Sequence, residues 1–92
     1  KQERSAQMKE FSYVIQAPEG LHARPAGLIV KLAQTFNSAV TFQANDKSAD
    51  GKRLFAVMKL AVKCGQELRV TVEGEDEDAA LGALERFCNE EL

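Results

Sequence analysis

Residues 11–36 have the sequence FSYVIQAPEGLHARPAGLIVKLAQTF, in which the spacing of the apolar side chains changes part-way along. Within 11–16, apolar and polar residues alternate, which is the pattern of a half-buried strand. Ala17–Gly20 contains Pro and Gly and interrupts that pattern. Over 23–36 the spacing becomes helical, with one apolar face made of Ala26, Ile29, Val30 and Ala33. The stretch therefore predicts a strand, a loop and an amphipathic helix in succession.

The rest of the chain alternates between the same two periods. A second strand is predicted at Val40–Ala44, followed by a tight turn at Asn45-Asp46 and a short polar strand at Lys47–Ala49. A short amphipathic helix is predicted from Leu54 to Ala61 and ends before Gly65. The last predicted elements are a strand at Leu68–Val72, an acidic helix start at Glu75–Asp78, and a buried helical stripe of Ala80, Leu81, Leu84, Phe87 and Cys88.

The predicted order of elements is β-α-β-β-α-β-α. The strands are half polar, which indicates a sheet with one face covered by helices and the other face exposed to water. The sequence therefore predicts an open-faced sandwich of one sheet and one layer of helices.

Length and composition exclude several classes of protein. The 92 residues, 45% of them hydrophobic and 28% charged, are typical of a single globular domain. A formal net charge of −2 argues against an overall basic nucleic-acid-binding protein. No apolar run approaches the roughly 20 residues of a membrane-spanning helix. We therefore expect no nucleic-acid partner and no insertion into a membrane.

The ends of the domain and the cysteines lead to three expectations. Residues 1–7 lack apolar periodicity and are predicted to be a disordered tag, linker or N-terminal extension, with the folded domain at residues 8–92. Cys64 and Cys88 form no C-x-x-C pair, and one His cannot complete a metal site with them. We expect two free thiols and no bound metal.

The charges are unevenly distributed along the chain. Residues 22–66 sum to +5, whereas residues 67–92 sum to −7. A basic middle segment is suited to an acidic partner or an anion. The alternative is that these charges are solvated and mixed in space once the chain folds.

Gly20–Ala26, with the sequence GLHARPA, is where chemically useful groups are concentrated. His22 is predicted at the N-cap of the first helix, where the N–H groups of Ala23 and Arg24 have no intrahelical acceptor and can bind an anion. The Arg24 guanidinium matches phosphate oxygens, and an imidazole offers a nucleophilic lone pair at pH 7. Pro25 suits the first helical turn.

These residues permit more than one interpretation. The first is phosphoryl transfer through His22, with Arg24 and the N–H groups of the helix start receiving the phosphoryl oxygens. The second is an anion-binding site without chemistry. The third is an ordinary helix cap beside a solvated arginine.

GLHARPA resembles the active-site signature of HPr, the family of histidine-containing phosphocarriers of the bacterial phosphoenolpyruvate:sugar phosphotransferase system. The resemblance covers Met8–Leu92 and includes Lys47-Ser48-Ala49, the helix from Leu54 and the run Val72–Glu77. It implies an α+β open-faced β-sandwich, in which a four-stranded antiparallel sheet is covered on one face by three helices.

The resemblance implies a phosphocarrier and not a self-sufficient enzyme. The phosphoryl group would arrive from enzyme I, itself charged by phosphoenolpyruvate, and leave to IIA domains for sugar uptake, with no cofactor. His22 would be the phosphoryl acceptor, through Nδ1, and Arg24 the charge partner of the phosphate, together with the backbone of Ala23 and Arg24. The docking surface would consist of Gly27, Arg53, Leu54, Phe55 and Met58, with Lys31 and Lys59 at its rim.

This chain departs from the family pattern at two positions. Many relatives carry a regulatory serine at the start of the second helix, where this chain has Arg53, and Ser48 lies on the short strand instead. We therefore expect no regulatory serine. Glu19 replaces the Asn or Thr that is common three residues before the active histidine. Because a buried unpaired carboxylate is costly, we expect Glu19 to point outward, away from the site.

The two departures motivate an alternative function. The chain would then be an HPr-like regulatory or binding module, or a specialised carrier from a nitrogen-related branch or from a fusion protein. Under either interpretation we expect a cytoplasmic monomer.

Overall fold

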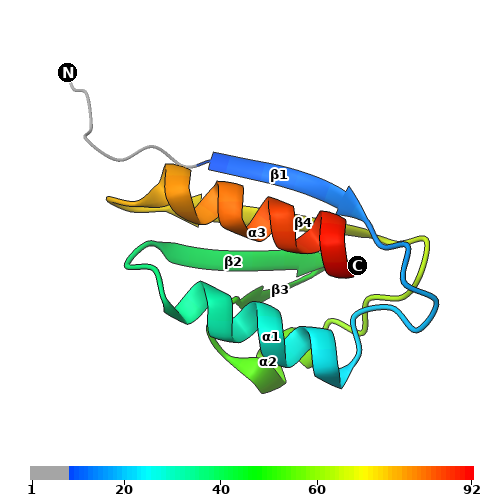
Figure 1. Ribbon diagram of the computed structural model, residues 1–92. Coiled ribbons are helices and arrows are strands. Elements are labelled where there is room, and N and C mark those ends of the chain that lie inside the picture. The colour runs from blue at the N-terminus through cyan, green and yellow to red at the C-terminus, as the bar shows by residue number, and fades with distance from the viewer. Residues whose placement is uncertain (1–8) are drawn as a thin grey trace.

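The computed structural model describes residues 9–92, so the predictions made for residues 1–7 and for Met8 lie outside the described residues. Seven elements follow the predicted order, with the strands and helices arranged as in Figure 1. They are β1 (Lys9–Val14), α1 (Ala23–Gln34), β2 (Ala39–Ala44), β3 (Lys47–Asp50), α2 (Leu54–Met58), β4 (Glu67–Glu73) and α3 (Glu77–Glu91).

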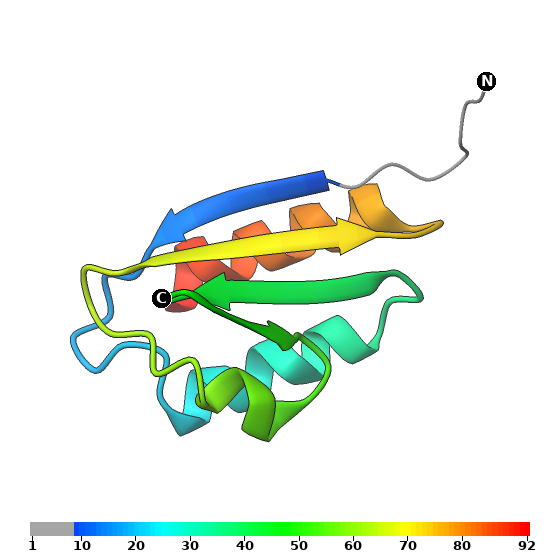
Figure 2. The ribbon, with the colours of Figure 1, turned by 180° about the vertical axis from the view of Figure 1, so that it is seen from behind.

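The described strands form one antiparallel sheet in the order β1-β4-β2-β3. One row of paired residues crosses all of them, from Phe11 through Val70 and Phe42 to Ala49. Phe42 and Val70 are completely buried because α1 and α3 cover this face, whereas Figure 2 shows the other face without helices. The predicted open-faced sandwich is confirmed.

The predicted turn after β2 is also confirmed. Asn45 and Asp46 both have positive φ, 54° and 64°, which are the angles of a two-residue hairpin turn whose twist matches that of the strands. Asn and Asp tolerate this backbone region better than most residues.

The second helix is shorter than predicted, because α2 ends at Met58 and does not continue to Ala61. The carbonyl of Leu60 accepts a hydrogen bond from the Asn45 side chain at 2.9 Å, and Ala61 has a φ of +53° that breaks the helix. Leu60 and Val62 are buried outside any helix. The backbone bonds change to the tighter i→i−3 pattern after Lys59, with Leu60 N–H donating to Val57 O and Ala61 N–H to Met58 O, and the Asn45 contact holds the segment that follows.

Asp76, the N-cap residue of α3, makes contacts with another segment that the sequence did not indicate. Asp76 accepts hydrogen bonds from the hydroxyl of Ser38 and from the backbone N–H groups of Asn37 and Ser38, both at 2.9 Å. The Ser38 hydroxyl and then the Asn37 N–H lower the pKa of the Asp76 carboxyl. Asp76 thereby connects α3 to the loop that follows α1.

Among the described residues, no helix is long and apolar enough to cross a membrane.

Candidate functional site

Three segments that are distant in the sequence meet at the N-terminal end of α1 (Figure 1). Loop 15–22 hydrogen-bonds to the 59–66 segment through Ile15 N–H to Gln66 O at 3.0 Å, and through Leu21 N–H to Val62 O at 2.9 Å. The backbone oxygen of Leu92 accepts the N–H groups of residues 16 and 17 at 2.6 and 2.7 Å. Loop 15–22 is thus held from two sides.

Gly20 lies where loop 15–22 closely approaches the 59–66 segment. Its φ is +72°, and a Cβ placed there would lie 2.5 Å from Val62 O and 2.8 Å from the Lys63 Cα. The next residue, Leu21, is buried and fixes the loop in the core. The direction in which the chain enters α1 therefore depends on this glycine.

His22 is the N-cap residue of α1, as predicted. Its backbone is extended, with φ −88° and ψ −173°, and its carbonyl accepts the Ala26 N–H at 2.9 Å. The imidazole makes no capping hydrogen bond, and its side chain is 42% exposed. By helix geometry the N–H groups of Ala23 and Arg24 lack an intrahelical acceptor. An exposed ring nitrogen and two available N–H groups therefore occur on consecutive residues.

The expectation that Glu19 points away from the site is wrong. Its Oε1 lies 3.4 Å from Nε2 of His22, although the Glu19 side chain is 77% exposed. The cost of burying a carboxylate did not decide its orientation, because Glu19 contacts the imidazole while its side chain remains exposed to solvent. The N–H of Gly20 donates to Ala17 O at 2.9 Å, and this turn brings Glu19 back towards His22.

Arg24 lies at one end of a shallow groove between α1 and α2. The groove has a volume of about 430 Å³ and is lined by Arg24, Gly27, Leu28, Val30, Lys31, Gln34 and Leu54. Phe55 and Met58 on α2 are 77% and 37% exposed. The structure therefore brings Gly27 and Leu54 of the predicted docking surface together in one groove with Arg24, and leaves Phe55 and Met58 exposed on α2.

Leu28 is a groove residue that the sequence reasoning missed. It is 40% exposed, and it is absent from the buried face predicted for α1. An apolar residue outside the buried stripe of an amphipathic helix is a signal that could have identified it. Gly27 has open space around it, since a Cβ placed there would meet no atom within 4 Å.

Arg53 is the N-cap residue of α2 and makes no capping hydrogen bond with its side chain. The Asp50 carboxylate accepts the Lys52 N–H at 3.0 Å, so it stabilises the turn before the helix and not the first helical N–H groups. Ser48 lies on β3, away from the start of α2, as the sequence analysis placed it.

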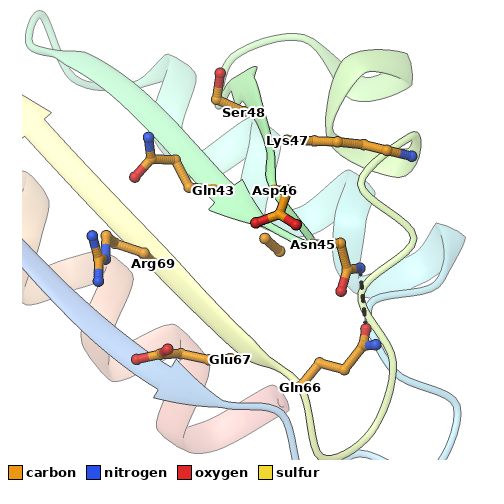
Figure 3. Close-up of a pocket in the computed structure, with 9 residues that line it drawn as sticks. Gln43, Asn45, Asp46, Lys47, Ser48, Gln66, Glu67 and Arg69 are labelled. Atoms are coloured by element: carbon orange, nitrogen blue, oxygen red, sulfur yellow. Dashed lines mark hydrogen bonds between the residues drawn. The ribbon is translucent and has the colours of Figure 1, made fainter.

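Ser48 borders a second hollow, of about 610 Å³, lined by residues of β2, β3, β4 and the adjacent loops. Figure 3 shows its polar lining, which includes Gln43, Lys47, Ser48 and Arg69. Within it, the Asn45 side chain donates to Oε1 of Gln66 at 3.2 Å, and the same oxygen accepts the Lys63 N–H at 2.8 Å. This hollow contains none of the predicted site residues, but its hydrogen bonds hold the 59–66 segment that supports loop 15–22.

The structure shows where the two thiols lie. Both cysteines are free; Cys64 is exposed, and Cys88 is buried. Burial raises the pKa of the Cys88 thiol to about 12, so this thiol stays protonated.

Within residues 9–92, no group of three or more His, Cys, Asp or Glu side chains gathers in a way that could hold a metal ion.

Comparisons with known proteins agree with this geometry. Residues 9–90 match the family model described as the PTS HPr component phosphorylation site. The chain is 39% identical over 79 residues to the phosphocarrier protein HPr of Mycoplasma capricolum, covering 86% of this chain and 89% of that relative. A solved Mycoplasma histidine-containing phosphocarrier protein superposes with a TM-score of 0.86 at 36% identity, covering 89% and 93% of the two chains. A solved HPr dimer from Thermoanaerobacter tengcongensis superposes with a TM-score of 0.72 at 34% identity, covering 89% and 94%.

Proposed function

The chain belongs to the HPr family of phosphocarrier proteins, and from that membership we propose that it carries a phosphoryl group on His22. The donor is enzyme I, charged by phosphoenolpyruvate, and the acceptors are IIA domains in the cytoplasm. The observation that carries the proposal is the exposed imidazole of His22 at the N-terminus of α1, directly before two N–H groups without intrahelical acceptors.

The site supplies the groups that phosphoryl transfer needs. A lone pair of the His22 ring attacks phosphorus while the bond from phosphorus to the donor breaks, and the electron pair of that bond leaves with the donor. The backbone N–H groups of Ala23 and Arg24 and the positive end of the helix dipole receive the phosphoryl oxygens. Arg24 adds positive charge. Partner proteins supply the rest of the catalysis, since transfer depends mainly on position and charge compensation.

The groove between α1 and α2 is the surface proposed for partner docking. Phe55 and Met58 are exposed on the same helix as Leu54, which lines the groove, and Lys31, Arg53 and Lys59 are exposed on the two helices or at their ends. A small apolar patch with a basic rim suits brief contacts with acidic partners. Enzyme I and IIA domains would use this surface in turn.

Uptake of one phosphoryl group is the direct test of the proposed function. The protein is incubated with enzyme I and phosphoenolpyruvate, and its intact mass is followed with time. We expect the mass of one phosphoryl group to be gained and then lost on mild acid treatment. No gain with enzyme I from several bacteria would contradict the proposal.

Sedimentation of the same sample tests the proposed monomer, because a solved relative is a dimer.

Phe55→Ala should weaken binding to enzyme I about five- to thirtyfold, because an exposed aromatic beside an apolar groove is a typical anchor at an interface. The side chain is 77% exposed, so its loss should leave the urea midpoint of unfolding unchanged. Isothermal titration measures the affinity. Val14→Ala is the matched control, since Val14 is an apolar residue, 51% exposed, on β1. Equal affinities for the two variants would exclude Phe55 from the docking surface.

The uneven charge predicts that the rate of association with enzyme I falls as salt is added. The basic segment 22–66 includes α1 and α2, whereas the acidic segment 67–92 includes α3, which lies on the other side of α1 from α2 (Figure 1). Between about 0.05 and 0.5 M salt, stopped-flow measurements should show the rate constant falling about tenfold. A rate constant that does not change with salt would remove charge steering from the mechanism.

A second candidate function is a regulatory or binding module that keeps the fold, and the contact of Glu19 with His22 favours it. A carboxylate beside the imidazole opposes the arrival of a phosphate dianion. This candidate requires partner binding and downstream activity that are both unchanged in His22→Ala. Loss of downstream activity in that variant would exclude it.

A further inference from the structure

The contact between Glu19 and His22 has no role in the phosphoryl transfer described above. Glu19 Oε1 lies 3.4 Å from Nε2, and neither group is buried. The N–H of Gly20 donates to Ala17 O, and Leu21 is buried, so the loop between the two residues has a defined course. The backbone therefore places the Cα atoms of Glu19 and His22 where their exposed side chains can meet.

We infer that Glu19 is a positioning residue, which holds the ring proton of His22 on Nε2 and thereby presents the Nδ1 lone pair for reaction. In a neutral imidazole one nitrogen carries the proton and the other a lone pair. The negative charge of the carboxylate, 3.4 Å from Nε2, favours the tautomer that carries its proton on that nitrogen. The reaction at Nδ1 rests on the proposed function, whereas the position of Glu19 beside Nε2 is taken from the structure.

The same contact affects the departure of the phosphoryl group. When the Nδ1 lone pair forms the bond to phosphorus, the donor leaves with its electron pair and Nε2 keeps its proton, so the ring becomes a cation. Glu19 stabilises that protonated ring. When an acceptor attacks phosphorus, the electron pair of the P–N bond returns to Nδ1, and the ring leaves as neutral imidazole.

Glu19 and Arg24 then have opposite effects on the phosphorylated state. Arg24 is exposed two residues after His22 and stabilises the phosphate through its positive charge. The Glu19 carboxylate repels the phosphate and attracts the positive charge of the ring, and both effects shorten the lifetime of the phosphohistidine. A phosphocarrier benefits from this balance because it must release the phosphoryl group as readily as it accepts it.

The tautomer of His22 is the first measurement, and it requires no phosphate. His22 is the only histidine of the sequence, so ¹⁵N NMR of the ring reports this residue alone. The spectra are recorded at pH 9, so that the two tautomers of the neutral ring are compared. Glu19→Ala should lower the ratio of Nε2-protonated to Nδ1-protonated ring about two- to fivefold, as expected for an exposed contact. Glu19→Gln should lower it as well, because an amide carries no net charge.

The lifetime of the phosphohistidine is the second measurement. Phosphoramidate, whose own P–N bond breaks with release of ammonia, phosphorylates histidine without any partner protein. After removal of the reagent, we expect the phosphohistidine of Glu19→Ala and Glu19→Gln to last about two- to fivefold longer at pH 7.5 than that of the unaltered protein. Glu10→Gln is the control, since it removes an exposed carboxylate from β1, near the end far from loop 15–22 (Figure 1), and should change neither result.

The outcomes separate this inference from the proposed function. If both the tautomer ratio and the lifetime in Glu19→Ala equal those of Glu10→Gln, the positioning role is overturned. If both change but enzyme I fails to phosphorylate the unaltered protein, the proposed function is overturned, whereas the role of Glu19 towards His22 is supported.

Discussion

His22→Ala is expected to abolish phosphoryl uptake from enzyme I completely. His22 is the only histidine of the chain, and its ring is 42% exposed at the start of α1, where an incoming phosphoryl group can reach it. Neither cysteine is at this position: Cys88 is completely buried, and Cys64 lies in the 59–66 segment with its Sγ 3.7 Å from Gln16 O. Among residues 9–92, removal of the imidazole leaves neither a histidine nor a cysteine next to the N–H groups of Ala23 and Arg24, so intact mass spectrometry should find no acid-labile phosphoryl group on the protein.

The fold of the His22→Ala protein should remain intact. The imidazole makes no capping hydrogen bond, so its removal should change the free energy of unfolding by less than about 1 kcal/mol. Urea denaturation and circular dichroism measure this change. A folded variant that still gains an acid-labile phosphoryl group would show that another residue is the acceptor, and the proposal for His22 would then be wrong.

Gly20→Ala is expected to cause the largest loss of stability of any variant considered for this protein, about 2 kcal/mol or more. The residue has a φ of +72°, which an alanine adopts at a cost of about 1–2 kcal/mol. The new Cβ would also lie 2.5 Å from the Val62 carbonyl oxygen, a backbone atom that cannot rotate away. Loop 15–22 must therefore move, and His22 moves with it.

Gly65→Ala is the matched control for Gly20→Ala. Gly65 also has a positive φ, +89°, but a Cβ there would meet no atom within 4 Å. Its replacement should therefore carry only the conformational cost, about 1–2 kcal/mol. Urea denaturation of both variants should show Gly20→Ala as the less stable, and phosphoryl uptake should be slowed in Gly20→Ala alone. Equal losses of stability would mean that loop 15–22 is free to move away from Val62.

The elements that could be predicted from the sequence are those stabilised by their own periodic burial. The predicted face of α1 (Ala26, Ile29, Val30 and Ala33) is buried, and the alternating residues of β2 and β4 face the core. The spacing of apolar residues, every two residues in a strand or about every 3.6 in a helix, is a local property of the sequence. It predicts the buried face of any element that packs one side against the core. The same reasoning located His22 at the N-cap, because Pro25 and the apolar pattern fix the start of the helix.

The predictions that were wrong or missing depend on contacts between distant segments. α2 ends at Met58, and the segment that follows it is held by the Asn45 side chain, which donates to the Leu60 carbonyl. The exposure of Phe55 is decided by which side of α2 packs against the rest of the fold, where Val57 is buried. Glu19 was placed by an argument about burial, although the carboxylate is exposed and still reaches His22.

By itself, the sequence determined the order of the elements, the faces that are buried and the residue that begins α1, since each of these follows from spacing along the chain. Only the tertiary structure decided how loop 15–22 is held, because its partners are Val62, Gln66 and Leu92, which lie at least 40 residues away in sequence. That support brings the Glu19 carboxylate to one side of the imidazole and leaves the N–H groups of α1 available. The type of reactive group is thus a property of the sequence, and the arrangement around it is a property of the packed chain.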